Sequence, residues 1–336
     1  MSEADIRRPA FDTEVAPLLQ ALPPLPRLDI ETIDELRVAT GPGPERVIEH
    51  AAALGLTHEE IVIDGPRGPI PMSVIRPERL SRPAPIYYTI HGGGMVSGNR
   101  FTAVIEVDEL KWTAEHGMVL VTPEYRLAPE HPAPAPVEDC YAGLAWAARN
   151  ATGWGADPAQ IIVAGASGGG GLAAGTVLMA RDRAEVVVRA QLLICPMLDD
   201  RNNTSSAGQY TGAAGGVWPT ENNQWAWRAV LGDGHAERDD VDHYSAPARA
   251  TDLSGLPEAF IDVGSAEVFR DEDVDYASRL WKAGVQAELH VWRGGYHGFD
   301  LIGPETPLGT ASRTARQSWV SRVVASMRAP TAVTIP

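Results

Sequence analysis

Short apolar runs of strand length alternate with longer amphipathic stretches over most of the chain. The apolar runs lie at 86–90, 118–121, 161–164, 190–194, 259–263 and 288–292. The stretches with helical periodicity lie near 103–116, 138–150, 168–181, 271–284 and 309–327. This alternation predicts βαβ units, and therefore an α/β fold with a mostly parallel central sheet and helices on both faces.

Three segments depart from this rhythm. Residues 1–55 read as amphipathic helices, and residues 61–75 read as two alternating strands around the turn at 65–68, which predicts a hairpin. Residues 199–250 show no clear strand and are rich in Asn, Gly and Asp. We interpret this last segment as an insertion over the carboxyl edge of the sheet, where open α/β sheets place their sites.

Composition and charge limit the classes of molecule that the chain is expected to bind. The chain has 336 residues, of which 44% are hydrophobic, and a net charge of −16. That charge disfavours nucleic acid and anionic membranes as partners, and mildly favours a neutral or cationic substrate. No apolar run approaches the roughly 20 residues that cross a bilayer, and the first residues lack the apolar core of a signal peptide. The simplest expectation is a cytoplasmic protein.

The two cysteines, Cys140 and Cys195, show no metal-binding spacing. We therefore expect two small buried thiols and no metal site.

A nucleophilic serine is the first candidate for chemistry. The apolar run at 161–164 leads into Gly165-Ala166-Ser167-Gly168-Gly169, and an Ala-rich helical stretch follows. A serine at a sharp strand-to-helix turn needs strained backbone angles, and small residues two positions before and after it avoid clashes. The following helix would point N–H groups and its positive end at the site. This context favours Ser167 as a nucleophile over an ordinary glycine-rich turn.

A glycine loop supplies candidate donors for a developing negative charge. The strand at 86–90 ends in His91-Gly92-Gly93-Gly94. The backbone N–H groups of Gly93 and Gly94, together with that of Gly168, would form a three-donor oxyanion hole. His91 and Gly92 complete the motif as support. The alternative is a flexible loop after a strand.

A general base and an orienting carboxylate should follow the serine in the chain. Of nine histidines, His297 follows the last predicted strand, and this fold places its base there. The acid should follow the strand at 259–263, where Glu267 lies nearest the strand end. Asp271 and Glu272 are the other candidates, although both fit better in the first turn of the next helix. We favour Glu267.

Together these residues resemble the hormone-sensitive-lipase-like family of α/β-hydrolase esterases. The resemblance runs from about residue 85 to 299. It rests on four blocks in the family's order, namely the HGGG motif at 91–94, Glu124-Tyr125-Arg126-Leu127-Ala128-Pro129-Glu130, the elbow at 165–170 and Tyr296-His297-Gly298-Phe299. The second block looks like support beneath the glycine loop.

The chain departs from the family pattern at two places. The family's elbow usually reads GDSAGG or GTSAGG, so that Ala166 here replaces a polar residue and Gly168 replaces alanine. A backbone donor at 168 survives that change. The family usually has Asp-Pro-Leu where this chain has Glu267-Val268-Phe269. Glutamate is one methylene longer and can still serve as the acid.

The resemblance also implies a helical cap over the site. It suggests that residues 1–55 form the N-terminal part of the cap and 199–250 the cap insertion, with 56–198 and 251–336 as the catalytic core. Apolar residues near the site then become candidates for a substrate pocket, or for ordinary packing of cap on core. These candidates are Met95, Val96, Tyr210, Trp218 and Trp225.

The working hypothesis is a serine carboxylesterase that needs no metal or organic cofactor. Short to medium acyl esters, or bulky small-molecule esters, are the expected substrates, since the cap segment lacks the large apolar lid of true lipases. A non-catalytic binding protein on the same fold is the alternative, and it would have a damaged triad. An amidase or lactonase is the nearest enzymatic alternative. The resemblance suggests a homodimer built on the last strand and the C-terminal helix.

Overall fold

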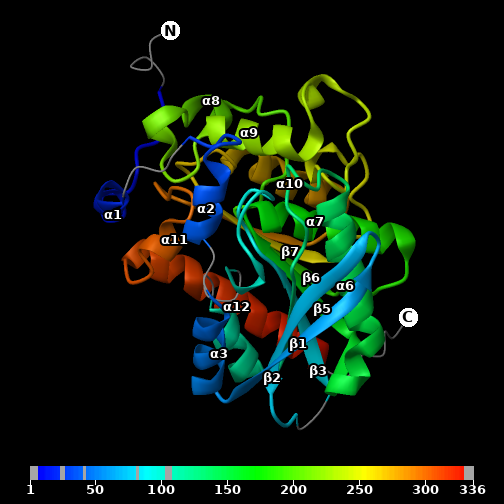
Figure 1. Ribbon diagram of the computed structural model, residues 1–336. Coiled ribbons are helices and arrows are strands. Elements are labelled where there is room, and N and C mark those ends of the chain that lie inside the picture. The colour runs from blue at the N-terminus through cyan, green and yellow to red at the C-terminus, as the bar shows by residue number, and fades with distance from the viewer. Residues whose placement is uncertain (1–6, 23–26, 41–42, 81–82, 103–107, 329–336) are drawn as a thin grey trace.

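One eight-stranded sheet organises the computed structural model, which describes residues 7–22, 27–40, 43–80, 83–102 and 108–328. The strands are β1 (Leu56–Gly65), β2 (Gly68–Pro77), β3 (Ala84–Ile90), β4 (Val119–Pro123), β5 (Ala156–Ala166), β6 (Ala190–Ile194), β7 (Glu258–Gly264) and β8 (Ala287–Trp292). Their order in the sheet is β1-β2-β4-β3-β5-β6-β7-β8 (Figure 1). The β1–β2 and β2–β4 pairs are antiparallel and all the others are parallel. The predicted mostly parallel α/β sheet is confirmed.

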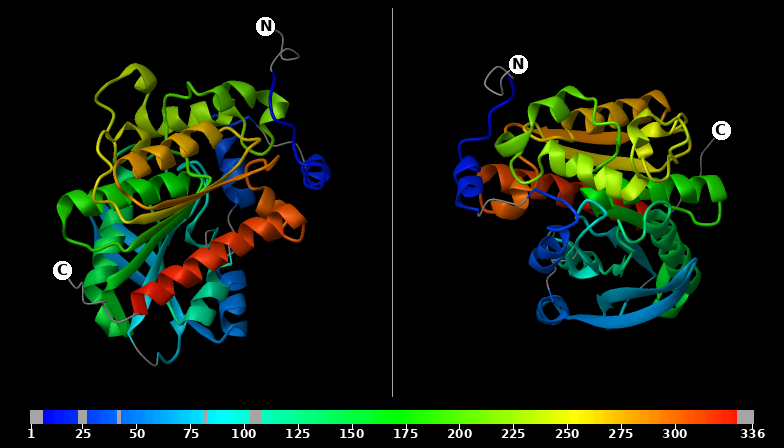
Figure 2. Two further views of the ribbon diagram at one scale, coloured as in Figure 1. Left: turned by 180° about the vertical axis from the view of Figure 1, so that it is seen from behind. Right: turned by 45° about the horizontal axis from the view of Figure 1, so that its top comes forward.

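Helices cover the two faces of the sheet. The larger ones are α5 (Glu109–His116), α6 (Ala135–Asn150), α7 (Gly168–Arg183), α10 (Arg270–Lys282) and α12 (Pro307–Arg328). α5 packs beside α12 on one face, and α6 packs beside α7 on the other (Figure 2). Residues at helical spacing on α12, Trp319, Val320, Val323 and Val324, are buried against the core. Burial of this stripe fixes the helix on the sheet.

Three of the inner strands are buried along their whole length. Every residue of β3, β4 and β6 is buried, as expected for parallel strands with helices on both sides. β1 lies at the edge of the sheet and alternates between buried and exposed positions. Each predicted strand lies inside an observed strand, except that the run at 118–121 begins one residue before β4. The predicted hairpin is the β1–β2 pair, which closes at Gly65 and Gly68.

Most of the predicted helices are also present. Residues 103–107 of the helix predicted near 103–116 lie outside the described residues, and α5 accounts for the rest. α6 begins at Ala135, a few residues earlier than predicted, with a proline in its first turn. Proline suits that position because the first N–H groups of a helix have no partner inside the helix.

The remaining helices belong to the predicted cap segments and to the turns. They are α1 (Ala16–Ala21), α2 (Ile33–Thr40), α3 (Pro44–Ala53), α8 (Ser205–Gln209), α9 (Thr220–Leu231) and α11 (Phe299–Ile302), with short 3₁₀ turns at Ala151–Trp154, Gly212–Gly215, His235–Glu237 and Pro247–Arg249. α1, α2, α8 and α9 gather at one end of the sheet (Figure 1). α3 instead packs against β1.

Three contacts fasten the N-terminal segment to the rest of the protein. The backbone N–H of Leu28 donates to Oδ1 of Asn222 on α9 at 3.0 Å. Arg37 on α2 forms an ion pair with Glu130 at 2.7 Å and donates from Nε to the carbonyl of Val96 at 2.9 Å. Within the described residues, no helix is long and apolar enough to span a bilayer.

Candidate active site

Ser167 lies at the sharp turn between β5 and α7. Its backbone φ of 57° is a conformation that residues other than glycine adopt at a cost. A side-chain carbon at Gly165 would collide with the backbone of Gly169, and one at Gly169 would collide with the carbonyl groups of Ile90 and His91. The two glycines of the Gly-x-Ser-x-Gly pattern are therefore required because the backbones at the ends of β3 and β5 and at the start of α7 lie in contact here.

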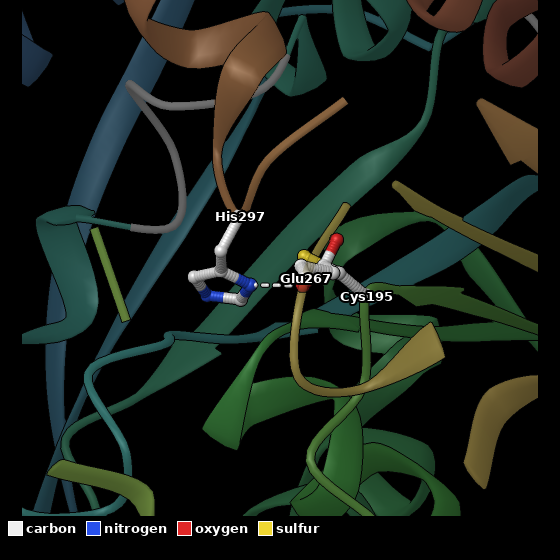
Figure 3. Close-up of side chains that lie close together, drawn as sticks. All are labelled: Cys195, Glu267 and His297. Atoms are coloured by element: carbon white, nitrogen blue, oxygen red, sulfur yellow. Dashed lines mark hydrogen bonds and ion pairs between the residues drawn. The ribbon is translucent and has the colours of Figure 1, made fainter. Parts of the chain in front are cut away.

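Ser167 is the first member of a hydrogen-bonded chain of three side chains. Its Oγ lies 3.0 Å from Nε2 of His297, and Nδ1 of the same ring lies 2.6 Å from Oε2 of Glu267. Figure 3 shows the second of these contacts, between His297 and Glu267. A carboxylate beside Nδ1 fixes the proton on that nitrogen, so that Nε2 is free to accept the hydroxyl proton of Ser167. The arrangement has the order and contacts of a nucleophile, a base and an orienting acid.

Glu267 is held in place on its other side. Its Oε1 accepts a hydrogen bond from the backbone N–H of Gly264 at 2.8 Å, and the side chain is 1% exposed. The structure thus places Glu267 against His297. Asp271, the alternative acid, accepts from the backbone N–H of Ser206 at 2.8 Å and pairs with Arg270. The contacts of Asp271 connect α10 to α8, whereas Glu267 is the carboxylate that contacts His297.

The glycine loop after β3 lies directly against the turn at Ser167. Gly93 and Gly94 have φ of 103° and 61°, values that favour glycine. Within the described residues, the backbone N–H groups of Gly93 and Gly94 donate to no protein acceptor. They are therefore available to a bound molecule in the cavity that both residues line.

The structure explains why glycine replaces the family's usual alanine at 168. A side-chain carbon at Gly168 would lie 2.8 Å from the backbone nitrogens of Gly94 and Met95. In this chain the loop and the start of α7 approach so closely that alanine would push the loop away. Gly168, directly after Ser167, therefore lies against Gly94 of the loop.

His91 and Tyr125 support the glycine loop at 92–94. The two rings stack with centroids 4.0 Å apart, and the Tyr125 hydroxyl donates to the carbonyl of His91 at 2.9 Å. Burial lowers the pKa of His91 to about 4, so the ring is neutral at physiological pH. Its Nδ1 lies 2.8 Å from the carbonyl of Gly92. This histidine fixes backbone and does not contact Ser167.

A cavity of about 330 Å³ opens onto Ser167 and His297. Its walls come from both the core and the predicted cap. They comprise Leu28, Leu36, Gly92, Gly93, Gly94, Ser97, Ala166, Ser167, Ile194, Cys195, Val217, Trp218, Asn222, His297, Gly298, Asp300, Leu301 and Ile302. A second cavity of about 670 Å³ shares Val217 and Asn222 with it and reaches none of the three triad residues.

Of the five predicted pocket residues, Trp218 lines the catalytic cavity. The Met95 and Val96 side chains are buried in the core, because the loop turns back at Met95 with φ of 63°. Tyr210 is buried and donates to the carbonyl of Pro9 at 3.0 Å. Trp225 packs, partly buried, against the core. These four residues lie outside the lining of the cavity.

Cys195 was not predicted at the site. It follows β6 directly, lines the cavity and adopts φ of 36°. Burial, and then the nearby carboxylate of Glu267, raise the pKa of its thiol. Both cysteines are free and buried, as expected. Cys195 directly follows β6, which neighbours β5 in the sheet. This position after a strand is the sequence signal that could have predicted Cys195 at the site.

A buried ion-pair network holds the turn that carries His297. Arg316 on α12 is 2% exposed and bridges Asp262 on β7, at 2.8 Å, to Asp300 on α11. Trp292 donates to the same oxygen of Asp262 at 2.9 Å. Because Asp300 lies three residues after His297, the network connects that turn to the sheet.

Replacing Arg316 by methionine is expected to lower the free energy of unfolding by about 3–5 kcal/mol, because two buried carboxylates lose their shared cation. Urea unfolding monitored by circular dichroism measures the change. Arg322→Met on the same helix is the matched control, since Arg322 is 59% exposed and its ion pair with Glu288 contributes less than about 1 kcal/mol. Equal losses in the two variants would contradict the role of the network.

Comparison with known proteins finds a matching family and several similar esterases. A family model described as alpha/beta hydrolase fold matches residues 87–301. The chain is 31% identical to esterase LipI of Mycobacterium tuberculosis over 306 residues, which cover 87% of this chain and 88% of that protein. It is 31% identical to carboxylesterase NlhH of the same organism over 315 residues, covering 90% and 94% of the two chains.

Solved structures agree with the sequence relatives. A bacterial heroin esterase superposes with a TM-score of 0.83 at 34% identity, covering 94% of this chain and 98% of the other. Esterase LipW from Mycobacterium marinum superposes with a TM-score of 0.80 at 32% identity, covering 95% and 98%.

Proposed function

The chain belongs to the alpha/beta hydrolase fold family that matches its residues 87–301, and from this premise we propose that it cleaves small-molecule carboxylic esters through an acyl-enzyme on Ser167. Carboxylic ester hydrolysis follows from its esterase relatives. The observation that carries the mechanism is the unbroken chain of hydrogen bonds from Ser167 through His297 to Glu267.

In the first step, Oγ of Ser167 attacks the acyl carbon while Nε2 of His297 takes its proton. Glu267 stabilises the imidazolium that forms and keeps the ring oriented. The bond to the alcohol then breaks, and His297 returns the proton to the leaving oxygen. The product of this half-reaction is an acyl-enzyme and a free alcohol.

In the second step, a water molecule attacks the acyl carbon with His297 as base, and the carboxylic acid leaves as Ser167 regains its proton. Both tetrahedral intermediates carry negative charge on the former carbonyl oxygen. The N–H groups of Gly93, Gly94 and Gly168 are the donors for that charge. Each such donor contributes a few kcal/mol to lowering the barrier.

The alternative of a non-catalytic binding protein requires a damaged triad. In this chain the serine, the histidine and the carboxylate are all present and in hydrogen-bonding contact. Ester hydrolysis by the relatives argues in the same direction.

Short to medium acyl chains are the proposed substrates. The catalytic cavity of about 330 Å³ lies near the lower end of the roughly 300–1,000 Å³ of small-molecule sites. Leu28 and Leu36 from the N-terminal segment, and Val217 and Trp218 from 199–250, supply apolar walls. We therefore take these two segments as the cap, and the second cavity as room for the bulkier part of a larger ester.

A series of p-nitrophenyl esters tests this substrate range. We expect kcat/KM to rise by roughly fourfold per methylene while the chain fills the cavity, as burial of about 0.8 kcal/mol per CH₂ implies, and to fall for longer chains. Trp218→Ala should move the optimum to longer chains, because Trp218 closes the cavity over Gly94. Trp225→Ala on α9 is the matched control and should leave the optimum unchanged. Activity that keeps rising up to emulsified long-chain triacylglycerols would contradict the proposal.

The predicted homodimer stays a prediction. β8 is the edge strand at the end of the sheet opposite β1, and Val291 on it is 43% exposed. An outer strand of this kind offers its backbone to a second copy.

A further inference from the structure

Cys195 brings a third metal-binding side chain to the pair formed by Glu267 and His297. The Sγ atom of the cysteine, a carboxylate oxygen of Glu267 and a ring nitrogen of His297 all lie within 4.8 Å of one another (Figure 3). All three residues are buried. Such a combination of thiol, imidazole and carboxylate at one point goes beyond what hydrolysis through Ser167 requires.

The fold brings these residues together because their strands are neighbours. β6, β7 and β8 are adjacent and parallel, so their carboxyl ends meet at one edge of the sheet. Cys195 follows the end of β6, Glu267 lies three residues after β7, and His297 lies five residues after β8. The spacing along the sequence gives no sign of the cluster, since each ligand comes from a different strand.

We propose that Cys195, Glu267 and His297 form a binding site for one thiophilic divalent cation, Zn²⁺ or Cd²⁺, and that the bound cation reversibly stops ester hydrolysis. Binding follows from the geometry of the three side chains. Inhibition rests in addition on the proposed function of His297 as the general base.

The donor set and the distances fit such a cation. Thiolate, imidazole and carboxylate bind Zn²⁺ at about 2.3, 2.1 and 2.1 Å, which separates the ligand atoms of a tetrahedral site by roughly 3.3–3.6 Å. The cluster therefore needs shifts of about 1 Å, with Glu267 and His297 moving apart from their present 2.6 Å. A water molecule from the cavity would complete the fourth position, as in open zinc sites.

A cation can reach the cluster through the substrate cavity. Cys195 and His297 both line that cavity, and the net charge of −16 favours the approach of cations. On binding, the thiol releases its proton to solvent and the thiolate bonds to the metal. The backbone N–H of Cys195 donates to the carbonyl of Asp262 at 2.7 Å, which holds the ligand near its partners.

A bound metal prevents His297 from acting as the base, whichever of its two ring nitrogens binds the cation. A cation on Nδ1 moves the single proton of the neutral ring from Nδ1, where Glu267 holds it, to Nε2, which then cannot accept from Ser167. A cation on Nε2 blocks the nitrogen directly. Glu267 is also withdrawn from the histidine, because its oxygen now binds the metal.

Inhibition is tested on the full chain after dialysis against EDTA. Initial rates of p-nitrophenyl acetate hydrolysis are measured while Zn²⁺, Cd²⁺ or Mg²⁺ is titrated. We expect Zn²⁺ and Cd²⁺ to inhibit, EDTA to restore the rate, and Mg²⁺, which prefers oxygen ligands, to have no effect. Cys195→Ala should raise the half-inhibiting concentration of Cd²⁺ at least about tenfold relative to wild type, each enzyme being compared with its own metal-free rate.

Cys140→Ala is the matched control, because Cys140 is also buried and lies on α6, away from the cluster. It should be inhibited as wild type is. Cys195→Ser, with a thermal unfolding curve for each variant, covers the case in which the alanine variant does not fold. Equal sensitivity to Cd²⁺ in wild type and in a folded Cys195 variant would overturn the proposal.

Binding is tested separately from catalysis in the Ser167→Ala background. Titration with Cd²⁺ should produce the ultraviolet charge-transfer band of a cadmium–thiolate bond, and Cys195→Ala in the same background should remove it. This readout does not depend on turnover, so failure of the metal site and failure of the proposed mechanism are distinguishable. Absence of the band in Ser167→Ala would overturn the site.

Discussion

Ser167→Ala is expected to lower kcat for ester hydrolysis by about 10⁴-fold to 10⁶-fold, with little change in KM. The alanine variant keeps the cavity, the glycine donors and the histidine, and lacks the atom that forms the covalent intermediate. What remains would be the slow attack of water helped by Gly93, Gly94 and Gly168. Steady-state kinetics with p-nitrophenyl butyrate measure the loss.

The fold of the Ser167→Ala variant should survive, since alanine is no larger than serine at this turn and meets the same φ of 57°. A thermal unfolding curve checks this. Ser321→Ala on α12 controls for the loss of a serine far from the cavity, and should retain the wild-type rate. Turnover in Ser167→Ala within tenfold of wild type would contradict the acyl-enzyme mechanism.

Glu267→Gln is expected to lower kcat by up to about 10⁴-fold, the second largest effect. The substitution preserves the shape of the side chain and removes the charge that stabilises the protonated His297. The backbone N–H of Gly264 keeps the amide oxygen of the variant as its acceptor, so the amide NH2 group faces Nδ1 at the place where Oε2 now lies 2.6 Å away. A donor there favours the ring tautomer with its proton on Nε2, which cannot accept from Ser167.

Asp271→Asn is the matched control for this prediction. Both carboxylates follow β7, and Asp271 contacts Ser206 and Arg270 in place of His297. We expect Asp271→Asn to retain nearly the wild-type kcat. A larger loss of kcat in Asp271→Asn than in Glu267→Gln would show that Asp271 orients the histidine.

The strands and the triad could be read from the sequence because both depend on local patterns. Fully buried strands such as β3 and β6 are runs of apolar residues, and parallel strands place whatever follows them at one edge of the sheet. Ser167, Glu267 and His297 each follow a strand, so their meeting could be expected before any contact was known.

The substrate pocket could not be read in the same way. Residues 199–250 and the described part of the N-terminal segment consist of short helices joined by irregular loops, so the direction of each side chain depends on packing between distant parts of the chain. Trp218 faces the cavity while Trp225, on the adjoining helix, faces the core. Leu28 and Asn222 line the cavity together through a hydrogen bond between residues far apart in sequence.

Cys195 shows a further limit of sequence reasoning. As one of two cysteines without a spacing pattern, it looked like an ordinary core residue. Its neighbours in space come from the ends of β7 and β8, and the order of strands in the sheet decides which residues those are.

The acyl-enzyme mechanism requires covalent modification of Ser167, and trapping of that serine is the decisive experiment. The protein is incubated with a p-nitrophenyl alkylphosphonate until hydrolysis stops, and is then examined by intact mass and by peptide mapping. We expect a single phosphonyl group per chain, located on Ser167, and no label on the Ser167→Ala variant. A label on another residue, or complete inactivation with Ser167 unmodified, would contradict the mechanism.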